Sequence, residues 1–302
     1  MITEDKVIEI FCLADDFCKV FSAQLTKYQL GAPKTTRKYY RKSTLSEAEV
    51  ITILILFHLQ GYRCLKHFYI EHVCKNMRDI FPDSVSYNRF VELQQSVLLP
   101  MTIFLKEVLL GKCTGISFVD STPLRVCKPQ RIHAHKVFRG IATRGHCSVG
   151  WFFGFKLHLI CNEKGELLNF VFTPANIDDR NPLDYASFMK NVKGKLVGDK
   201  GYLSQQLFER LFVDGIQLIT KIKKNMKNSL ISAYDKLLLR KRAIIETIND
   251  ELKNICQIEH SRHRSFANFL ANALAALAAY CLLPKKPSIN IQFETSNQLT
   301  MF

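Results

Sequence analysis

The spacing of hydrophobic residues divides the chain into two parts. Up to about residue 110, apolar residues recur at helical intervals, as Val7, Phe11, Cys18 and Phe21 do. After residue 111, short apolar runs bounded by turn residues indicate strands. We therefore expect a helical N-terminal region over 1–110, an α/β domain over 111–285 and a C-terminal tail over 286–302.

Local signals place several helix ends in the N-terminal region. Thr44-Leu45-Ser46-Glu47 has the pattern of a capping box, and Gly61 closes the helix that it opens over 45–60. A second helix is predicted over 64–76. Ser86 caps a third helix, which Pro100 interrupts. The helices on either side of Gly61 either form a helix-turn-helix or have only a structural role.

The second part alternates strands and helices. Strands are predicted over 116–119, 151–161, 167–172, 196–198 and 216–222. Helices are predicted over 181–191, 204–213 and about 234–256, with Ser204 as the N-cap of the second. This order predicts a mixed α/β fold with a five-stranded sheet and flanking helices.

Two aspartates stand where buried strands end. Asp120 ends the apolar run over 116–119, and Asp199 follows Leu196-Val197-Gly198. Burying a carboxylate costs several kcal/mol unless it is paired or binds a metal. Ligand sites gather at the carboxyl ends of strands in open α/β sheets. We therefore expect the two carboxylates to lie close together at one edge of the sheet.

A third acid, Glu246, lies on the helix predicted over 234–256. At about 100° per residue, Arg242 and Lys253 fall within roughly 40° of Glu246 around the helix axis. Taken alone, such a stripe is better explained as a surface ion-pair pattern. Beside two strand-end aspartates, however, it predicts a carboxylate ligand flanked by two phosphate contacts. Three converging carboxylates suit hard divalent cations, which prefer oxygen ligands.

These motifs carry a family resemblance. Phe118-Val119-Asp120-Ser121-Thr122 and Gly198-Asp199-Lys200-Gly201-Tyr202 resemble the first and second aspartate motifs of bacterial insertion-sequence transposases with a DDE catalytic domain. Arg242, Glu246 and Lys253 match the signature around the third acid. The resemblance spans nearly the whole chain and is closest to the insertion-sequence 982 group. Leu239 stands where related families have a tyrosine, which puts only an accessory contact in doubt.

The resemblance implies a ribonuclease-H-like fold in which Asp120, Asp199 and Glu246 are catalytic and hold two Mg²⁺ ions, with Mn²⁺ as a substitute. It implies strand cleavage at the terminal inverted repeats of a mobile element, followed by strand transfer into target DNA. It also implies a homodimer or higher oligomer on DNA, in the bacterial cytoplasm at the nucleoid. The alternatives are a ribonuclease-H-like nuclease without strand transfer and a DNA-binding regulator that no longer cuts.

A basic segment joins the first two predicted strands. Residues 121–150 contain no Asp or Glu, and they include Arg125, Lys128, Arg131, Lys136, Arg139 and Arg144. Uncompensated charge of one sign needs a partner, and the DNA backbone is the natural one beside a phosphodiester-cutting site. We expect Arg125, Lys136, Arg139 and Arg144 to grip phosphates together with Arg242, Lys253 and Lys200. A solvated loop is the alternative.

Composition agrees with a basic globular protein. Of 302 residues 47% are hydrophobic, which excludes a disordered chain, and a net charge of +15 favours a polyanionic partner. The ten cysteines are scattered, which indicates reduced, buried thiols instead of a disulfide framework. No secretory signal is visible, and 266–283 is expected to be a buried core helix and not a membrane span.

Two polar groups near the predicted site have an open role. Asp178-Asp179-Arg180 follows the third predicted strand and either supports the site or precedes a helix capped by Asn181. Lys156 and His158 lie on the second predicted strand, facing away from Phe155 and Leu157. His158 therefore either approaches the site or is a hydrogen-bonded histidine within the sheet.

Overall fold

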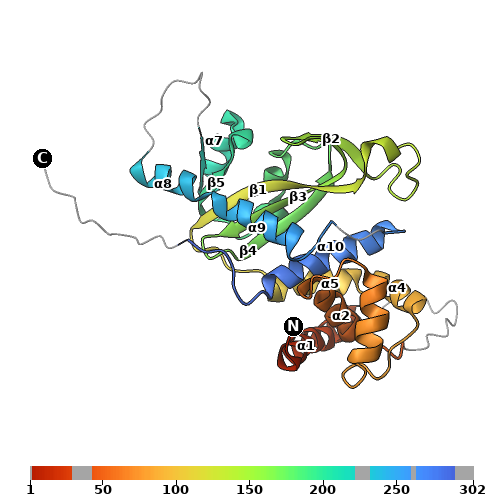
Figure 1. Ribbon diagram of the computed structural model, residues 1–302. Helices are drawn as coiled ribbons and strands as arrows, with labels where there is room; N and C mark the ends of the chain where they lie inside the picture. The colour runs from red at the N-terminus through yellow and green to blue at the C-terminus, as the bar shows by residue number, and fades with distance from the viewer. Residues whose placement is uncertain (1, 29–42, 222–231, 260–262, 290–302) are drawn as a thin grey trace, which may run out of the picture.

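A sheet and a group of helices lie side by side in the computed structural model of the chain, which describes residues 2–28, 43–221, 232–259 and 263–289. The helices of the N-terminal region lie below the sheet in Figure 1, and α10 (Phe266–Cys281) lies between the two. The predicted helical N-terminal region and the predicted mixed α/β sheet are both confirmed.

The N-terminal region contains α and π helices. Their bounds are Glu4–Tyr28 (α1), Glu47–Leu59 (α2), Leu65–His67 (α3), Phe68–Asn76 (η1), Tyr87–Ser96 (α4), Leu98–Phe104 (α5) and Leu105–Leu109 (η2). The segment predicted as one helix over 64–76 is thus mostly a π-helix. Nearly every residue of α2 is buried, so α2 is the centre of this bundle and has no free face.

Most of the predicted caps are present, although two are displaced. The capping box is formed by Ser46 and Glu49 instead of Thr44 and Glu47, because Ser46 is the residue with extended backbone before α2. Gly61, with φ +68°, ends this helix. Ser86 caps α4 as predicted. The following interruption comes at Val97, which leaves Pro100 in the first turn of α5, where proline is tolerated.

The sheet has six strands, one more than predicted. Their bounds are Ile116–Cys127 (β1), Thr143–Cys147 (β2), Gly150–Asn162 (β3), Leu167–Pro174 (β4), Gly194–Gly198 (β5) and Ile216–Thr220 (β6). The predicted end of the last strand, Ile222, lies outside the described residues. The strand order is β2-β3-β1-β5-β6, and β4 also pairs with β3. Both β2 and β4 therefore pair with β3: β2 with its first residues, 150–154, and β4 with the following residues, 155–161.

Short helices connect the later strands. Their bounds are Pro129–Arg131 (η3), Asn181–Asp184 (η4), Ala186–Met189 (α6), Lys200–Tyr202 (η5), Gln205–Val213 (α7), Ala233–Lys241 (α8) and Ala243–Asn254 (α9). Ser204 caps α7 as predicted. The helix predicted over 181–191 is two short pieces, because Tyr185 between them has extended backbone. The helix predicted over 234–256 is likewise divided, at Arg242.

Helix α10 joins the two parts of the molecule. Its residues from Ala271 to Tyr280 are all buried, and it contacts α2, α4, α5 and α9. A continuous hydrophobic cluster includes these helices and one face of the sheet. Residues 266–283 therefore form a core helix, as predicted. None of the helices within the described residues is long and apolar enough to cross a membrane.

All ten cysteines are free. Cys18, Cys161 and Cys256 are buried, as the sequence indicated, but Cys12 and Cys64 are exposed. The predicted C-terminal tail is described only as far as residue 289, where the backbone N–H of Ile289 donates to the carbonyl of Glu163 (2.8 Å).

The basic segment after β1 is anchored by one aromatic residue. Phe138 is only 3% exposed, and its ring lies 5.3 Å from that of Phe269 and 5.9 Å from that of Phe155. The segment is therefore pinned between α10 and β3, while its cations face solvent. This geometry holds the basic residues in fixed positions along the sheet and argues against a freely solvated loop.

We predict that Phe138→Ala lowers the free energy of unfolding by about 3–5 kcal/mol, because it leaves a cavity in this aromatic cluster. Urea denaturation measures the loss. Lys136→Ala, a change at an exposed neighbouring position, should shift stability by less than about 0.5 kcal/mol. Equal stability of the two variants would contradict the anchoring role of Phe138.

Candidate active site

The register of two parallel strands brings the predicted aspartates together. In the β1–β5 pairing, Ile116 lies opposite Lys195 and Phe118 opposite Val197. Continued by two residues, the same register sets Asp120 beside Asp199. Asp199 follows directly after β5, but Asp120 does not end its strand as predicted, because pairing with β3 extends β1 to Cys127. The adjacency expected from the sequence is thus built into the hydrogen bonding of the sheet.

Gly198 and Tyr202 shape the turn that carries Asp199. The chain leaves β5 in the short helix η5, and the Tyr202 ring, 2% exposed, folds back onto the strand end. A Cβ atom on Gly198 would lie 3.1 Å from this ring. A larger residue would therefore push the ring away. Close packing of Gly198 against Tyr202 gives a physical reason for the glycine and the tyrosine in this motif.

Two helices with different partners deliver the third acid. Helix α8 contacts β5 and β6, and α9 contacts β1 and α10. A salt bridge between Lys195 Nζ and Asp235 Oδ1 (2.5 Å) holds α8 on β5. The helix is interrupted at Arg242, and α9 then lies over β1 (Figure 1), with Glu246 in its first turn.

The three acids meet around the guanidinium of Arg242. Its Nη1 lies 3.9 Å from Asp120 Oδ1, and its Nη2 lies 4.0 Å from Asp199 Oδ1. Nη2 also donates to Glu246 Oε1. The Arg242 side chain is 14% exposed, whereas those of Asp199 and Glu246 are about half exposed, at 50% and 56%. One largely buried cation thus lies among three carboxylates, of which those of Asp199 and Glu246 open toward solvent.

Asp120 is the buried member of this group. Its carboxylate accepts a hydrogen bond from Asn249 Nδ2 (3.1 Å), and its side chain is 21% exposed. Burial raises the pKa of Asp120 to about 6, although the charge of Arg242 opposes this rise. At neutral pH the ionised carboxylate of Asp120 therefore destabilises the folded protein, and a stronger cationic partner would reduce this destabilisation.

Sequence reasoning missed Asn249. It is 9% exposed and projects from α9 toward Asp120, one turn after Glu246. The signal was available, since a polar residue interrupts the apolar stripe of Ile245, Ile248 and Leu252 at helical spacing. Its Oδ1 atom is buried and makes no hydrogen bond with another described residue.

No metal-binding group is assembled in this arrangement. Within the described residues, no cluster of three or more His, Cys, Asp or Glu side chains has the geometry to hold a metal ion. The three carboxylates instead share one positive charge, that of Arg242.

The other predicted DNA contacts lie at the surface around this centre. Lys200 is exposed beside Asp199, and Lys253 is half-buried farther along α9. Arg125, Lys136, Arg139 and Arg144 are exposed along the end of β1 and the segment up to β2. Arg242 differs from these residues, since its charge is already paired.

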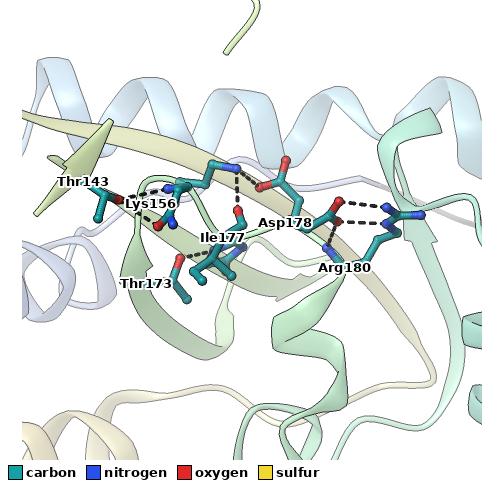
Figure 2. Close-up of polar contacts among 9 residues, drawn as sticks. Thr143, Lys156, Thr173, Ile177, Asp178 and Arg180 are labelled. Carbon is teal, nitrogen blue, oxygen red and sulfur yellow. Dashed lines mark hydrogen bonds and ion pairs between the residues drawn. The ribbon is translucent and has the colours of Figure 1, made fainter. Parts of the chain in front are cut away.

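Figure 2 shows a separate polar network around Lys156. Lys156 pairs with Pro123, whereas Asp120 pairs with Leu159, so Lys156 and Asp120 project from opposite faces of the sheet. Lys156 Nζ donates to Asp179 Oδ1 and to the carbonyl of Ile177, both at 2.8 Å. Asp178 forms two hydrogen bonds with the Arg180 guanidinium, which lower the pKa of this carboxyl to about 2. Asn181 does not cap a helix, since η4 begins without a side-chain cap.

His158 belongs to this opposite side. Its Nε2 lies 2.9 Å from Thr173 Oγ1, and it pairs with Ser121 across β1 and β3, whereas Asp120 pairs with Leu159. Neighbouring residues of a strand face opposite sides. His158 is therefore a hydrogen-bonded histidine within the sheet and does not point toward the three acids.

Comparison with known proteins identifies a family to which the chain is similar. A family profile described as a transposase DDE domain matches residues 110–266. Among solved structures, the chain is similar to the piggyBac transposase synaptic complex with hairpin DNA, at 11% identity and a TM-score of 0.49, covering 93% of this chain and 72% of that one. It is also similar to the Mos1 strand transfer complex, at 9% identity and a TM-score of 0.24, covering 88% and 85%. No curated protein sequence matches the chain.

The profile covers β1 to β6 and the helices α8 and α9, and with them all three acids around Arg242. Since the matched segment is more than half of the chain, this protein belongs to the transposase DDE domain family.

Proposed function

We propose that this protein is a transposase that cuts DNA at the ends of a mobile element and joins the freed 3′-OH to target DNA. The observation that carries the proposal is the convergence of Asp120, Asp199 and Glu246, from two strands and a helix, on a single positive charge. Three acids this close repel one another unless a cation lies between them. We therefore propose that the three acids, at the neighbouring strands β1 and β5 and the helix α9, form a centre whose activity depends on a bound cation.

The strand order supports the finer fold assignment. β1 lies between β3 and β5, and β6 follows β5 at the edge. With β4 beside β3, this is the order expected for a ribonuclease-H-like fold, and we propose that fold for residues 111–285. Residues 1–110 would bind DNA ends or assemble protomers. Since two ends of a mobile element must be joined, the working form would be a homodimer or higher oligomer.

Divalent metal ions fit the donor chemistry of this centre. Carboxylate oxygens are the ligands that Mg²⁺ and Mn²⁺ prefer, and Asp120, Asp199 and Glu246 would hold them once Arg242 has moved aside. Two bound ions would supply activation of the attacking oxygen and stabilisation of the leaving one. Asn249 keeps Asp120 in position through its hydrogen bond.

The protein itself would contribute position and charge. Lys200 beside Asp199 and Lys253 beyond Glu246 flank the acids, as phosphate contacts would. Arg242, released from the carboxylates, would become a third phosphate contact at the same centre. Fixing the phosphodiester against these groups turns the reaction into an effectively intramolecular one.

DNA is the partner that the charge distribution favours. The net charge is +15, and the anchored segment after β1 exposes Arg125, Lys136, Arg139 and Arg144 on the strand that carries Asp120 or just beyond it. Such a track neutralises backbone phosphates, and binding through it weakens steeply as salt rises.

We predict that Asp199→Asn and Glu246→Gln each abolish cleavage and joining. The assay supplies a plasmid carrying the element ends, a target plasmid and Mg²⁺, and it measures excised and joined products on gels. Asp250→Asn, an exposed acid farther along α9, should retain activity. Cleaved but unjoined product from the wild type would indicate a nuclease without strand transfer. No cleavage by the wild type would indicate a DNA-binding regulator.

We predict that Asp120→Asn stabilises the metal-free protein at pH 7.5 by about 1–3 kcal/mol. Because the folded-state pKa of Asp120 is raised to about 6, the wild type loses stability as pH rises from about 4 through 6, and asparagine lacks this charge. Urea denaturation in EDTA across pH 4 to 7.5 measures the difference, which should vanish near pH 4. A difference independent of pH would contradict the assigned burial cost.

We predict that Arg242→Gln destabilises the metal-free protein, because it leaves three carboxylates without their shared cation. A cost of roughly 1–3 kcal/mol is expected for a part-buried pair broken on one side. Thermal melts should show that millimolar Mg²⁺ restores most of the loss. Lys241→Gln, at the exposed neighbouring position, should behave as the wild type. Equal Mg²⁺ responses of the two variants would contradict competition between Arg242 and the metal.

A further inference from the structure

The single tryptophan of the chain is exposed. Trp151 lies near the start of β3, in the β2–β3 hairpin, and 69% of its surface is open to solvent. Val149, at the turn of the same hairpin, is 78% exposed. Aromatic side chains this large gain stability from burial, and neighbouring exposed apolar residues mark surfaces that meet a partner.

Trp151 forms one wall of a pocket of about 350 Å³. The pocket lies between the end of β1 and the start of β3, which the pairing of Cys127 with Phe153 holds together. Its lining residues include Arg125, Lys128, Pro129, Val149 and Trp151, and none of them is acidic. The volume is within the range of small-ligand sites. The pocket is suited to an aromatic or apolar group that carries negative charge.

The tryptophan is held in place before any ligand binds. Trp151 pairs with His146 across β2 and β3, and the two rings meet edge to face at 5.2 Å. The next residue, Phe152, is only 2% exposed and fixes the backbone from the other side of the strand. A ring fixed on a strand loses little conformational freedom when a flat group stacks on it.

An unpaired nucleotide has the chemistry that this pocket selects. Its base would stack on the Trp151 indole, as bases do on aromatic residues in single-strand binding sites. Its phosphates would meet Arg125 and Lys128. A base inside a duplex is covered on both faces by its neighbours, so only an unstacked base could enter.

The pocket is within reach of DNA held at the three acids. Arg125 and Lys128 lie on the chain that continues from Asp120, about 17 and 26 Å farther along at about 3.3 Å per residue. At about 3.4 Å per nucleotide along one strand, this corresponds to roughly five to eight nucleotides. Arg144 on β2 is exposed near the same end of the sheet.

We infer that Trp151, Arg125 and Lys128 form a binding site for an unpaired nucleotide of the DNA substrate, several nucleotides from the scissile phosphate. The inference rests on the proposed function, because the strand that supplies this nucleotide is one that the enzyme holds or cuts. It assigns the β2–β3 hairpin a role in distinguishing unpaired from paired DNA.

Trp151 is itself the probe for the test, since the chain has no other tryptophan. In EDTA, where no cleavage occurs, the protein is titrated with a blunt duplex and with the same duplex carrying a single-stranded extension of about ten nucleotides. Indole fluorescence reports stacking, and anisotropy of labelled DNA reports binding. We expect saturable quenching by the extended DNA and much less by the blunt duplex.

Variants separate the base contact from general DNA binding. Trp151→Leu should weaken binding of the extended DNA by about 5- to 100-fold, with unchanged affinity for the blunt duplex, and Trp151→Phe should retain most of the affinity. Phe212→Leu, at an exposed aromatic position on α7, is the control and should bind both DNAs as the wild type does. Circular dichroism verifies that each variant is folded.

Two results would overturn the inference. One is equal affinity of Trp151→Leu and the wild type for the extended DNA, and the other is equal quenching by both DNAs. Neither result touches the transposase proposal, because blunt-duplex binding and the cleavage assay remain independent of Trp151. Failure of the wild type to bind any DNA would overturn the proposed function and the inference together.

Discussion

The geometry of this protein depends on one guanidinium held among three carboxylates. Arg242 is largely buried, and its ends reach Asp120, Asp199 and Glu246. Opposite charges this close attract one another, and the attraction is screened by solvent at Asp199 and Glu246, which are half exposed. The arginine is thus an internal counter-ion that the three acids share.

The fold produces this cluster with ordinary devices. Parallel pairing of β1 and β5 aligns the two aspartates. Helix α8 then packs against β5 and β6, and α9, which begins after Arg242, packs against β1. Arg242 therefore lies at the junction of two helices that contact different strands. From this position its side chain reaches acids from three separate elements.

Local chemistry was predictable from the sequence, and long-range geometry only in part. The position of Asp199 after its strand, the caps Ser86 and Ser204, and Gly61 could be placed because their signals lie within a few residues. The end of the strand that carries Asp120 could not, because pairing with β3 extends β1 to Cys127. The break at Arg242 could not, because helical periodicity continues through it. It arises from α8 and α9 packing on different strands.

The same limit explains what was missed. Strand β2 lies in a basic segment without an apolar run, and pairing with β3 alone defines it. Asn249 visibly interrupts an apolar stripe in the sequence, but only the structure shows that its partner is Asp120. The structural role of such positions depends on tertiary contacts, whereas hydrophobic periodicity describes a single segment without its packing partners.

Anchoring of the segment after β1 gives its basic residues fixed positions on the surface. The cations after β1 would repel one another in a loose loop. Without fixed positions, they would bind any polyanion. Phe138 ties their segment to α10 and β3, and α10 is packed on the N-terminal helices. In the proposed complex, a DNA strand lying on these cations would have a fixed position relative to the whole molecule, with Asp120 in the first half of β1 and Trp151 beside the far end of that strand. The hydrophobic core would therefore set the distance between the proposed catalytic acids and the proposed nucleotide site.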